Sequence, residues 1–87
     1  METVINEYIS REFVKDAALL PLADDAPLLD SGILDSLSLL RLVVFVEERF
    51  GVTMGDADLL PENFASVNAI CGYLRAREAG KQELARG

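Results

Sequence analysis

The chain has 87 residues, 51% of them hydrophobic, and a formal net charge of −7, enough for one small domain with a single core. The acidic balance disfavours nucleic-acid binding, because phosphate contacts need Lys and Arg, and we expect no nucleic-acid partner. With no histidine and one cysteine, Cys71, His-based catalysis, an internal disulfide and a His or Cys metal site are excluded. We predict no catalytic residue and no metal site.

The sequence contains no basic and apolar N-terminal signal and no apolar run of membrane-spanning length. A single cysteine fits a reducing compartment. We therefore expect a cytoplasmic protein that does not enter a membrane.

A first helix is predicted over residues 2–15, where apolar residues recur at helical spacing and Thr3 is a candidate N-cap. Residues 16–34 form a long connection containing Pro21, Pro27 and Gly32. Connections of this length are usually held in place or functional. The residues expected to bury themselves and hold it are Leu19, Leu20, Leu22, Leu28, Leu29, Ile33 and Leu34.

The second predicted helix covers residues 36–50. It begins at Asp35 or Ser36, because both side chains can cap a helix, and it stops at Gly51. The inward face is expected to contain Leu39, Leu42, Val43, Val46 and Phe50. The opposite side contains Leu37, Leu40, Val44 and Glu48, flanked by Arg41 and Glu47. So many outward aliphatic residues indicate a partner-docking surface, a helix buried nearly all round, or leucines scattered on an ordinary surface.

Residues 52–65 form a second connection with short helical turns near residues 56–60 and 61–64. Its candidate core residues are Leu59, Leu60 and Phe64. Ser66 is the predicted N-cap of a last helix over residues 67–79. The inward residues there are expected to be Val67, Ile70, Cys71 and Leu74, with Tyr73 partly so, and Cys71 is interpreted as a small core residue.

These elements predict an all-α fold, a small four-helix bundle of three main helices plus one short helix, with a long first connection. Residues 1–80 form the domain, and residues 81–87 are expected to be a polar, frayed C-terminal tail.

The junction before the second helix is the candidate functional site. A helix N-terminus has partial positive charge and spare N–H donors, so it favours a phosphate ester. Ser36 offers a hydroxyl there, with Asp35 before it and Leu37 after it. The alternative is that Asp35 and Ser36 only cap the helix.

The pattern Gly32-x-x-Asp35-Ser36-Leu37, followed by an apolar helix ending in Glu47-Glu48-x-Phe50-Gly51, resembles the acyl carrier and peptidyl carrier protein family. The resemblance runs from about Leu28 to Leu74 and includes residues 61–70, which look like the segment joining the third and fourth helices of stand-alone carriers. It implies that Ser36 carries a covalent 4'-phosphopantetheine arm from coenzyme A. It also implies that Asp35 lies beside the phosphate and that Leu37 fills a partner pocket.

In that family the second helix is the main recognition helix. The resemblance therefore implies partner docking through Leu37, Leu40, Arg41, Val44, Glu47 and Glu48. The implied partners are a phosphopantetheinyl transferase, an acyl- or aminoacyl-loading enzyme, and a downstream synthase or transferase. The protein would be a monomer that is a substrate of enzymes and not an enzyme itself, holding its cargo as a thioester.

The pathway is less constrained. Many fatty-acid-synthesis carriers place acids where this chain has Ser38 and Arg41. This departure favours polyketide, nonribosomal-peptide or unusual extender-unit pathways, with fatty-acid synthesis or D-alanyl transfer as alternatives. A carrier-like helical interaction module that is never modified remains the competing interpretation.

Overall fold

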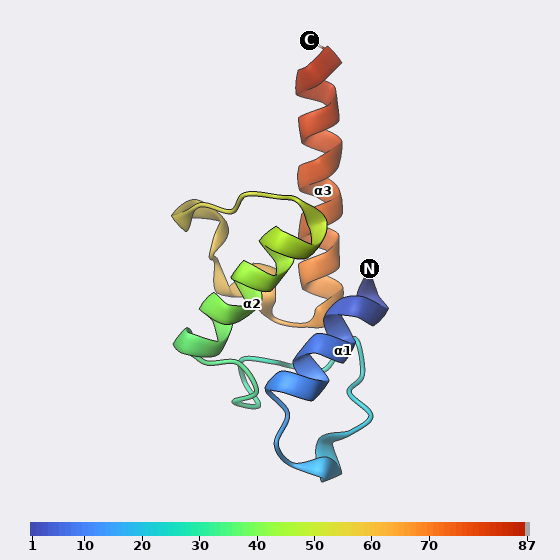
Figure 1. Ribbon diagram of the computed structural model, residues 1–87, viewed down its shortest axis with the longest axis vertical. Coiled ribbons are helices and arrows are strands. Elements are labelled where there is room, and N and C mark those ends of the chain that lie inside the picture. Colours follow the sequence, from blue (N-terminus) through green and yellow to red (C-terminus); the bar gives the residue numbers. More distant parts are fainter. Residues whose placement is uncertain (87) are drawn as a thin grey trace.

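Three α-helices form the body of the protein in a computed structural model that describes residues 1–86, with side chains described for residues 1–77. They are α1 (Glu2–Glu12), α2 (Ser36–Phe50) and α3 (Val67–Arg86) (Figure 1). Short 3-10 turns occupy the connections: η1 (Ala17–Leu19), η2 (Asp56–Asp58) and η3 (Pro61–Phe64). No strand occurs in residues 1–86. The all-α fold with three main helices and a long first connection is confirmed. The helical turns predicted near residues 56–60 and 61–64 occur as η2 and η3, and η1 in the first connection was not predicted.

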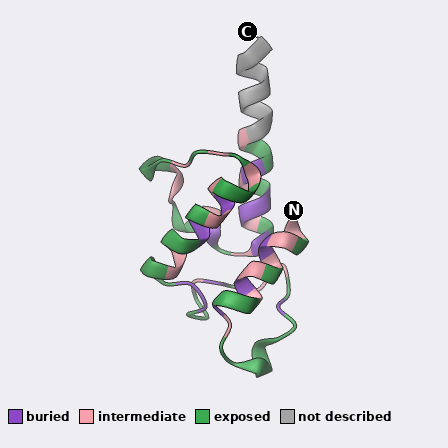
Figure 2. Ribbon diagram, viewed as in Figure 1, coloured by how far each residue is buried: buried purple, intermediate pink, exposed green. Residues whose placement is uncertain are grey.

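One hydrophobic core joins the three helices and both connections (Figure 2). Its fully buried members come from every main element, for example Ile5 of α1, Leu42 of α2 and Ile70 of α3. The predicted inward residues of α3 are all buried or, for Tyr73, half-buried. Tyr8 of α1 stacks on Phe45 of α2 with ring centroids 3.8 Å apart, which ties these two helices together.

Helix α1 differs from its prediction at both ends. Its N-cap is Met1, which makes no side-chain capping bond, so Thr3 lies inside the helix and the predicted cap is wrong. The helix ends at Glu12 and not at residue 15. Phe13 follows as the C-cap, and its side chain is buried in the core. The helix therefore ends where the Phe13 side chain enters the core, before the end that the sequence pattern predicted.

The first connection is held by backbone bonds as well as by burial. The Leu28 N–H donates to the Ala65 carbonyl at 2.8 Å, and the Asn68 N–H donates to the Asp24 carbonyl at 2.9 Å. The Asn6 amide of α1 donates to the Leu22 carbonyl at 2.7 Å. The side chains of Leu22, Leu28, Ile33 and Leu34 are buried and that of Leu29 is half-buried.

Two leucines of this connection do not bury as predicted. Leu19 and Leu20 are 46% and 42% exposed. Leu19 ends the η1 turn and Leu20 is its C-cap, and the core is filled by residues that come later in the connection. The sequence of a leucine-rich connection therefore does not show which of its leucines face the core.

The second connection is fastened to α3 through Asp58. Its carboxylate accepts hydrogen bonds from the Tyr73 hydroxyl and from the Gly55 N–H, and it lies 3.5 Å from Nη1 of Arg77. The hydrogen bond from Tyr73 is the main reason that the pKa of Asp58 is lowered. Phe64 is fully buried, as predicted, and Leu59 is half-buried. Leu60 is 45% exposed, so its predicted core position is wrong, because it is the N-cap residue that leads into η3.

Helix α3 begins as predicted, since the Ser66 hydroxyl accepts the Ala69 N–H at 3.0 Å. It continues to Arg86, past the predicted end at residue 79. Gly87 lies outside the described residues, and the division into a domain of residues 1–80 and a tail stays a prediction. Cys71 is buried, as predicted, and burial raises the pKa of its thiol. Among the helices of residues 1–86, none is both long and apolar enough to cross a membrane.

Phe64 offers a test of this packing. We expect Phe64→Ala to lower the free energy of unfolding by about 3–5 kcal/mol, because it empties a fully buried aromatic site. Leu60→Ala, in the same connection but 45% exposed, should change it by no more than about 0.5 kcal/mol. Urea unfolding followed by circular dichroism measures both, and equal losses in the two variants would contradict the packing described here.

Candidate functional site

The chain turns sharply just before α2. Gly32 has a φ of 80°, a backbone conformation that a side chain would strain, and its N–H donates to the Leu29 carbonyl at 3.1 Å. Ile33 and Leu34 then enter the core. Burial of these two side chains anchors the backbone immediately before Asp35. The start of α2 follows directly and lies at the surface.

Asp35 caps the helix. Its backbone is extended, with φ −122° and ψ −171°, and its carboxylate accepts the Ser38 N–H at 2.9 Å. That backbone hydrogen bond is the main reason that the pKa of Asp35 lies below its usual value, with the Ser38 hydroxyl adding to the effect. Because Asp35 fills the capping role, Ser36 is the first helical residue and its side chain is left exposed.

The residues at this junction fit a phosphate ester on Ser36. The hydroxyl-bearing residue is exposed, and it lies in the first turn of a 15-residue helix, where backbone N–H groups and the helix dipole favour negative charge. The nearby carboxylate of Asp35 is already engaged with Ser38.

A row of exposed aliphatic residues begins next to Ser36. Leu37 is 75% exposed, Leu40 54% and Val44 51%. Their spacing of three and four residues places them on one face of α2, and we call this set the α2 stripe. On the opposite face Leu42, Val43 and Val46 are buried. The exposure of the stripe contradicts the interpretation of α2 as a helix buried nearly all round.

The charged residues predicted for docking fall into two groups. Glu48 is exposed on α2. Arg41 is exposed as well, but it also contacts the end of α1: its Nη2 lies 3.1 Å from Oε1 of Glu12, and its Cζ lies 5.1 Å from the centre of the Phe13 ring. Glu47 accepts the backbone N–H of Met54 at 2.8 Å. Arg41 and Glu47 therefore contribute contacts within the fold, and docking by any of the six predicted residues stays a prediction.

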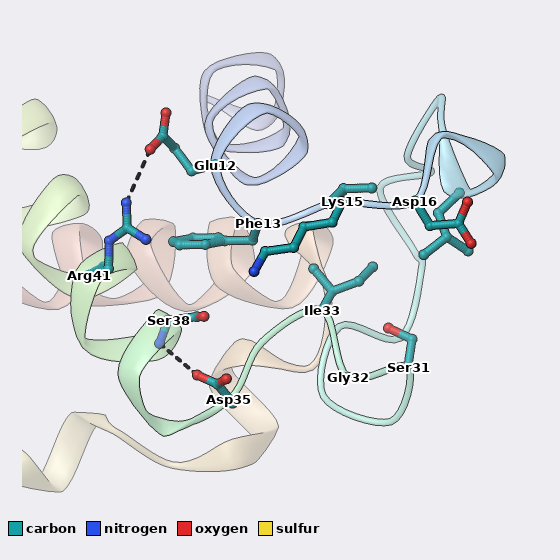
Figure 3. A pocket seen from close by; sticks show the side chains of 12 residues that line it. Glu12, Phe13, Lys15, Asp16, Ser31, Gly32, Ile33, Asp35, Ser38 and Arg41 are labelled. Carbon is teal, nitrogen blue, oxygen red and sulfur yellow. Dashed lines mark hydrogen bonds and ion pairs between the residues drawn. The ribbon is translucent and has the colours of Figure 1, made fainter.

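A cleft of about 330 Å³ opens beside the start of α2 (Figure 3). The sequence did not predict this cleft. Phe13 and Lys15 line it from the stretch just after α1, and Ile33 from the first connection. Asp35 lines it from the N-cap position of α2, and Ser38 from the first turn of that helix. Three separate segments build this cleft, so no local sequence pattern signals it. No group of three or more His, Cys, Asp or Glu side chains suited to a metal ion occurs among the side chains described.

A family model described as "Phosphopantetheine attachment site" matches residues 9–74. The matched range contains the whole of α2, both connections and the buried start of α3. No curated protein matches the sequence closely enough to count as a relative.

The cap makes a prediction about pH. Because the pKa of Asp35 is lowered in the folded protein, the ionised carboxylate stabilises the fold above the ordinary value of 3.8, and this contribution is lost as pH falls through the lower folded value. NMR titration of the Asp35 carboxyl carbon should give a midpoint below 3.8, with the Ser38 amide shifting at the same pH. Asp35→Asn should remove the Ser38 response. A midpoint at or above 3.8 would contradict the capping bond.

Proposed function

The chain belongs to the phosphopantetheine attachment site family, and from this we propose that it is an acyl or aminoacyl carrier whose arm is attached to Ser36. The family carries a covalently attached 4'-phosphopantetheine group. The observation that supports Ser36 as the attachment point is its position: it is exposed at the start of α2 while Asp35 takes the capping role. Leu37 follows as the most exposed large hydrophobic residue described.

In the proposed modification the Ser36 hydroxyl oxygen forms a new bond to the phosphorus of the phosphopantetheinyl half of coenzyme A. The pyrophosphate bond of coenzyme A breaks, the adenosine bisphosphate half leaves, and the serine proton passes to a base on the transferase. The transferase and its Mg²⁺ supply this chemistry. The chain supplies an exposed nucleophile, and the Asp35 carboxylate lies next to it in sequence, where it can face the metal or basic groups of the transferase.

When bound, the arm supplies a terminal thiol that holds an acyl or aminoacyl group as a thioester. The protein then keeps this group at high effective concentration for each enzyme that it meets. The chain has no histidine, and we propose that it performs no catalysis of its own and acts as a substrate and partner of enzymes.

Carrier domains interact in general with a phosphopantetheinyl transferase and with loading and synthase enzymes. For this chain we propose that the α2 stripe, together with the exposed Glu48, meets those partners. A small aliphatic patch with an acid at its edge suits weak contacts that must release again. The net charge of −7 favours partners with basic surfaces.

Arg41 and Ser38 support a proposal about pathway. The acids that fatty-acid-synthesis carriers place there are missing, and Arg41 instead pairs with Glu12 of α1. We therefore favour a polyketide, nonribosomal-peptide or related secondary pathway over fatty-acid synthesis or D-alanyl transfer. The monomeric state and the cytoplasmic location stay predictions, and an unmodified interaction module is the alternative function.

Intact mass measurement tests the attachment. The folded protein, incubated with coenzyme A, Mg²⁺ and a broad-specificity transferase, should gain one phosphopantetheinyl group. Ser36→Ala should gain none, because the nucleophile is gone. Thr53→Ala, which removes an exposed hydroxyl beyond the other end of α2, should load like the unchanged protein. Loading of Ser36→Ala would move the site elsewhere, and failure of the folded protein with several transferases would favour the unmodified module.

The α2 stripe makes a separate prediction. Leu37→Asp should lower kcat/KM for loading about tenfold, the loss expected when a central apolar anchor of an interface is removed. Leu20→Asp, at a leucine that is 42% exposed but far from α2 in sequence, is the matched control and should load at the original rate. Circular dichroism checks that both variants keep their helix content. Equal rates for the two variants would show that the stripe is ordinary surface.

A further inference from the structure

A second surface depression lies between the first and second connections, and we call it the connection groove. It is lined by Pro27, Leu29, Asp30, Pro61, Glu62 and Ala65. Its volume of about 280 Å³ lies just below the range of about 300–1,000 Å³ that is usual for small-molecule sites. It shares no residue with the cleft beside α2 or with the α2 stripe. The groove therefore has room for one long side chain and is separate from both surfaces.

The two walls of the connection groove are joined through the backbone and anchored in the core. The Leu28 N–H donates to the Ala65 carbonyl at 2.8 Å, which links the first connection to the end of η3. Leu28 and Phe64 are fully buried, and each is next in sequence to a residue that lines the groove. Within the first wall, the Ser31 N–H donates to the Pro27 carbonyl at 3.1 Å.

The connection groove also lies close to the start of α2. The Leu34 N–H donates to the Leu28 carbonyl at 3.0 Å, and Leu34 comes two residues before Ser36. Leu28 itself stands between the lining residues Pro27 and Leu29. A protein that contacts Ser36, or a group attached there, can therefore reach the groove at the same time.

The lining of the connection groove is apolar except for two acids, one on each wall. Asp30 belongs to the first connection and Glu62 to η3, and both are exposed. Neither a lysine nor an arginine is among the six lining residues. Where side chains are described, five ion pairs lie within 4.0 Å, and neither acid takes part in one. The groove thus combines apolar surface with negative charge that no cation of those side chains balances.

We propose that the connection groove receives an arginine side chain of an enzyme that acts on the carrier, an inference that rests on the proposed carrier function. The methylene groups of the arginine lie along Leu29 and the two prolines, and its guanidinium donates to the carboxylates of Asp30 and Glu62. Arginine suits this groove better than lysine, because its guanidinium is more weakly hydrated and presents several N–H donors in one plane.

The connection groove makes a second demand on a partner that already fits the α2 stripe. An enzyme with an arginine at this place gains charge pairs at both walls, whereas an acidic side chain there meets two like charges. Because repulsion of wrong partners contributes to specificity as much as attraction of right ones, the groove selects among enzymes that all dock on the stripe.

Binding of a single arginine tests the groove without an identified enzyme. The probe is arginine capped as the N-acetyl and N-methylamide derivative, titrated into the apo protein and followed by NMR. The amide signals of Leu29, Asp30, Glu62 and Ala65 should shift together, with a dissociation constant in the millimolar range. Capped citrulline has nearly the same shape without the charge and should bind about two- to fivefold more weakly, the effect expected when exposed ion pairs are lost.

Three variants locate the binding site. Asp30→Asn and Glu62→Gln should each raise the dissociation constant of capped arginine about two- to fivefold. Asp25→Asn is the matched control, because it removes an exposed acid of the first connection that does not line the groove, and it should leave the constant unchanged. Equal constants in all three variants, or equal binding of capped citrulline, would overturn the arginine site.

Two further outcomes separate this inference from the carrier function. Loading at Ser36 by intact mass, without arginine-specific shifts, would overturn the groove and leave the carrier function intact. Shifts without loading would overturn the carrier function and with it the assignment of the arginine to an enzyme. Shifts of the same signals on concentrating the protein alone would assign the groove to a second copy of this chain and overturn the enzyme partner.

Discussion

The hydrogen bond from the Ser38 N–H to the Asp35 carboxylate is the interaction on which the site depends. It satisfies a free donor of the first turn of α2 with a side chain that is not Ser36. If Asp35 did not fill this role, the Ser36 hydroxyl would be the next candidate for it and would be used inside the fold. Burial of Ile33 and Leu34 just before the cap fixes where the helix begins.

One face of helix α2 packs into the core, and the opposite face is exposed. Its buried face joins the core, and the Arg41 contact with Glu12 and the Phe13 ring binds it to the end of α1. Glu47 holds the chain that follows the helix by accepting the Met54 N–H. These contacts hold α2 on its other sides, and the α2 stripe is left exposed.

Local signals in the sequence predicted α2 with its correct bounds, because Asp35 and Gly51 mark its ends and Gly51 adopts a φ of 69°. Ser66 predicted the start of α3 in the same way. The sequence could not show that Leu19 and Leu60 stay exposed, because only tertiary packing decides which leucines reach the core. The pairing of Arg41 with Glu12, 29 residues away, and the cleft around Lys15 arise from segments that no local pattern connects.

The central claim is that one serine hydroxyl at the start of α2 receives the prosthetic group. Fragmentation of the loaded protein in a tandem mass spectrometer locates the added mass on the chain most directly. We predict that every fragment containing Ser36 carries the phosphopantetheinyl group and that fragments lacking this residue do not. An added mass on any other residue, with Ser36 unmodified, would contradict the account.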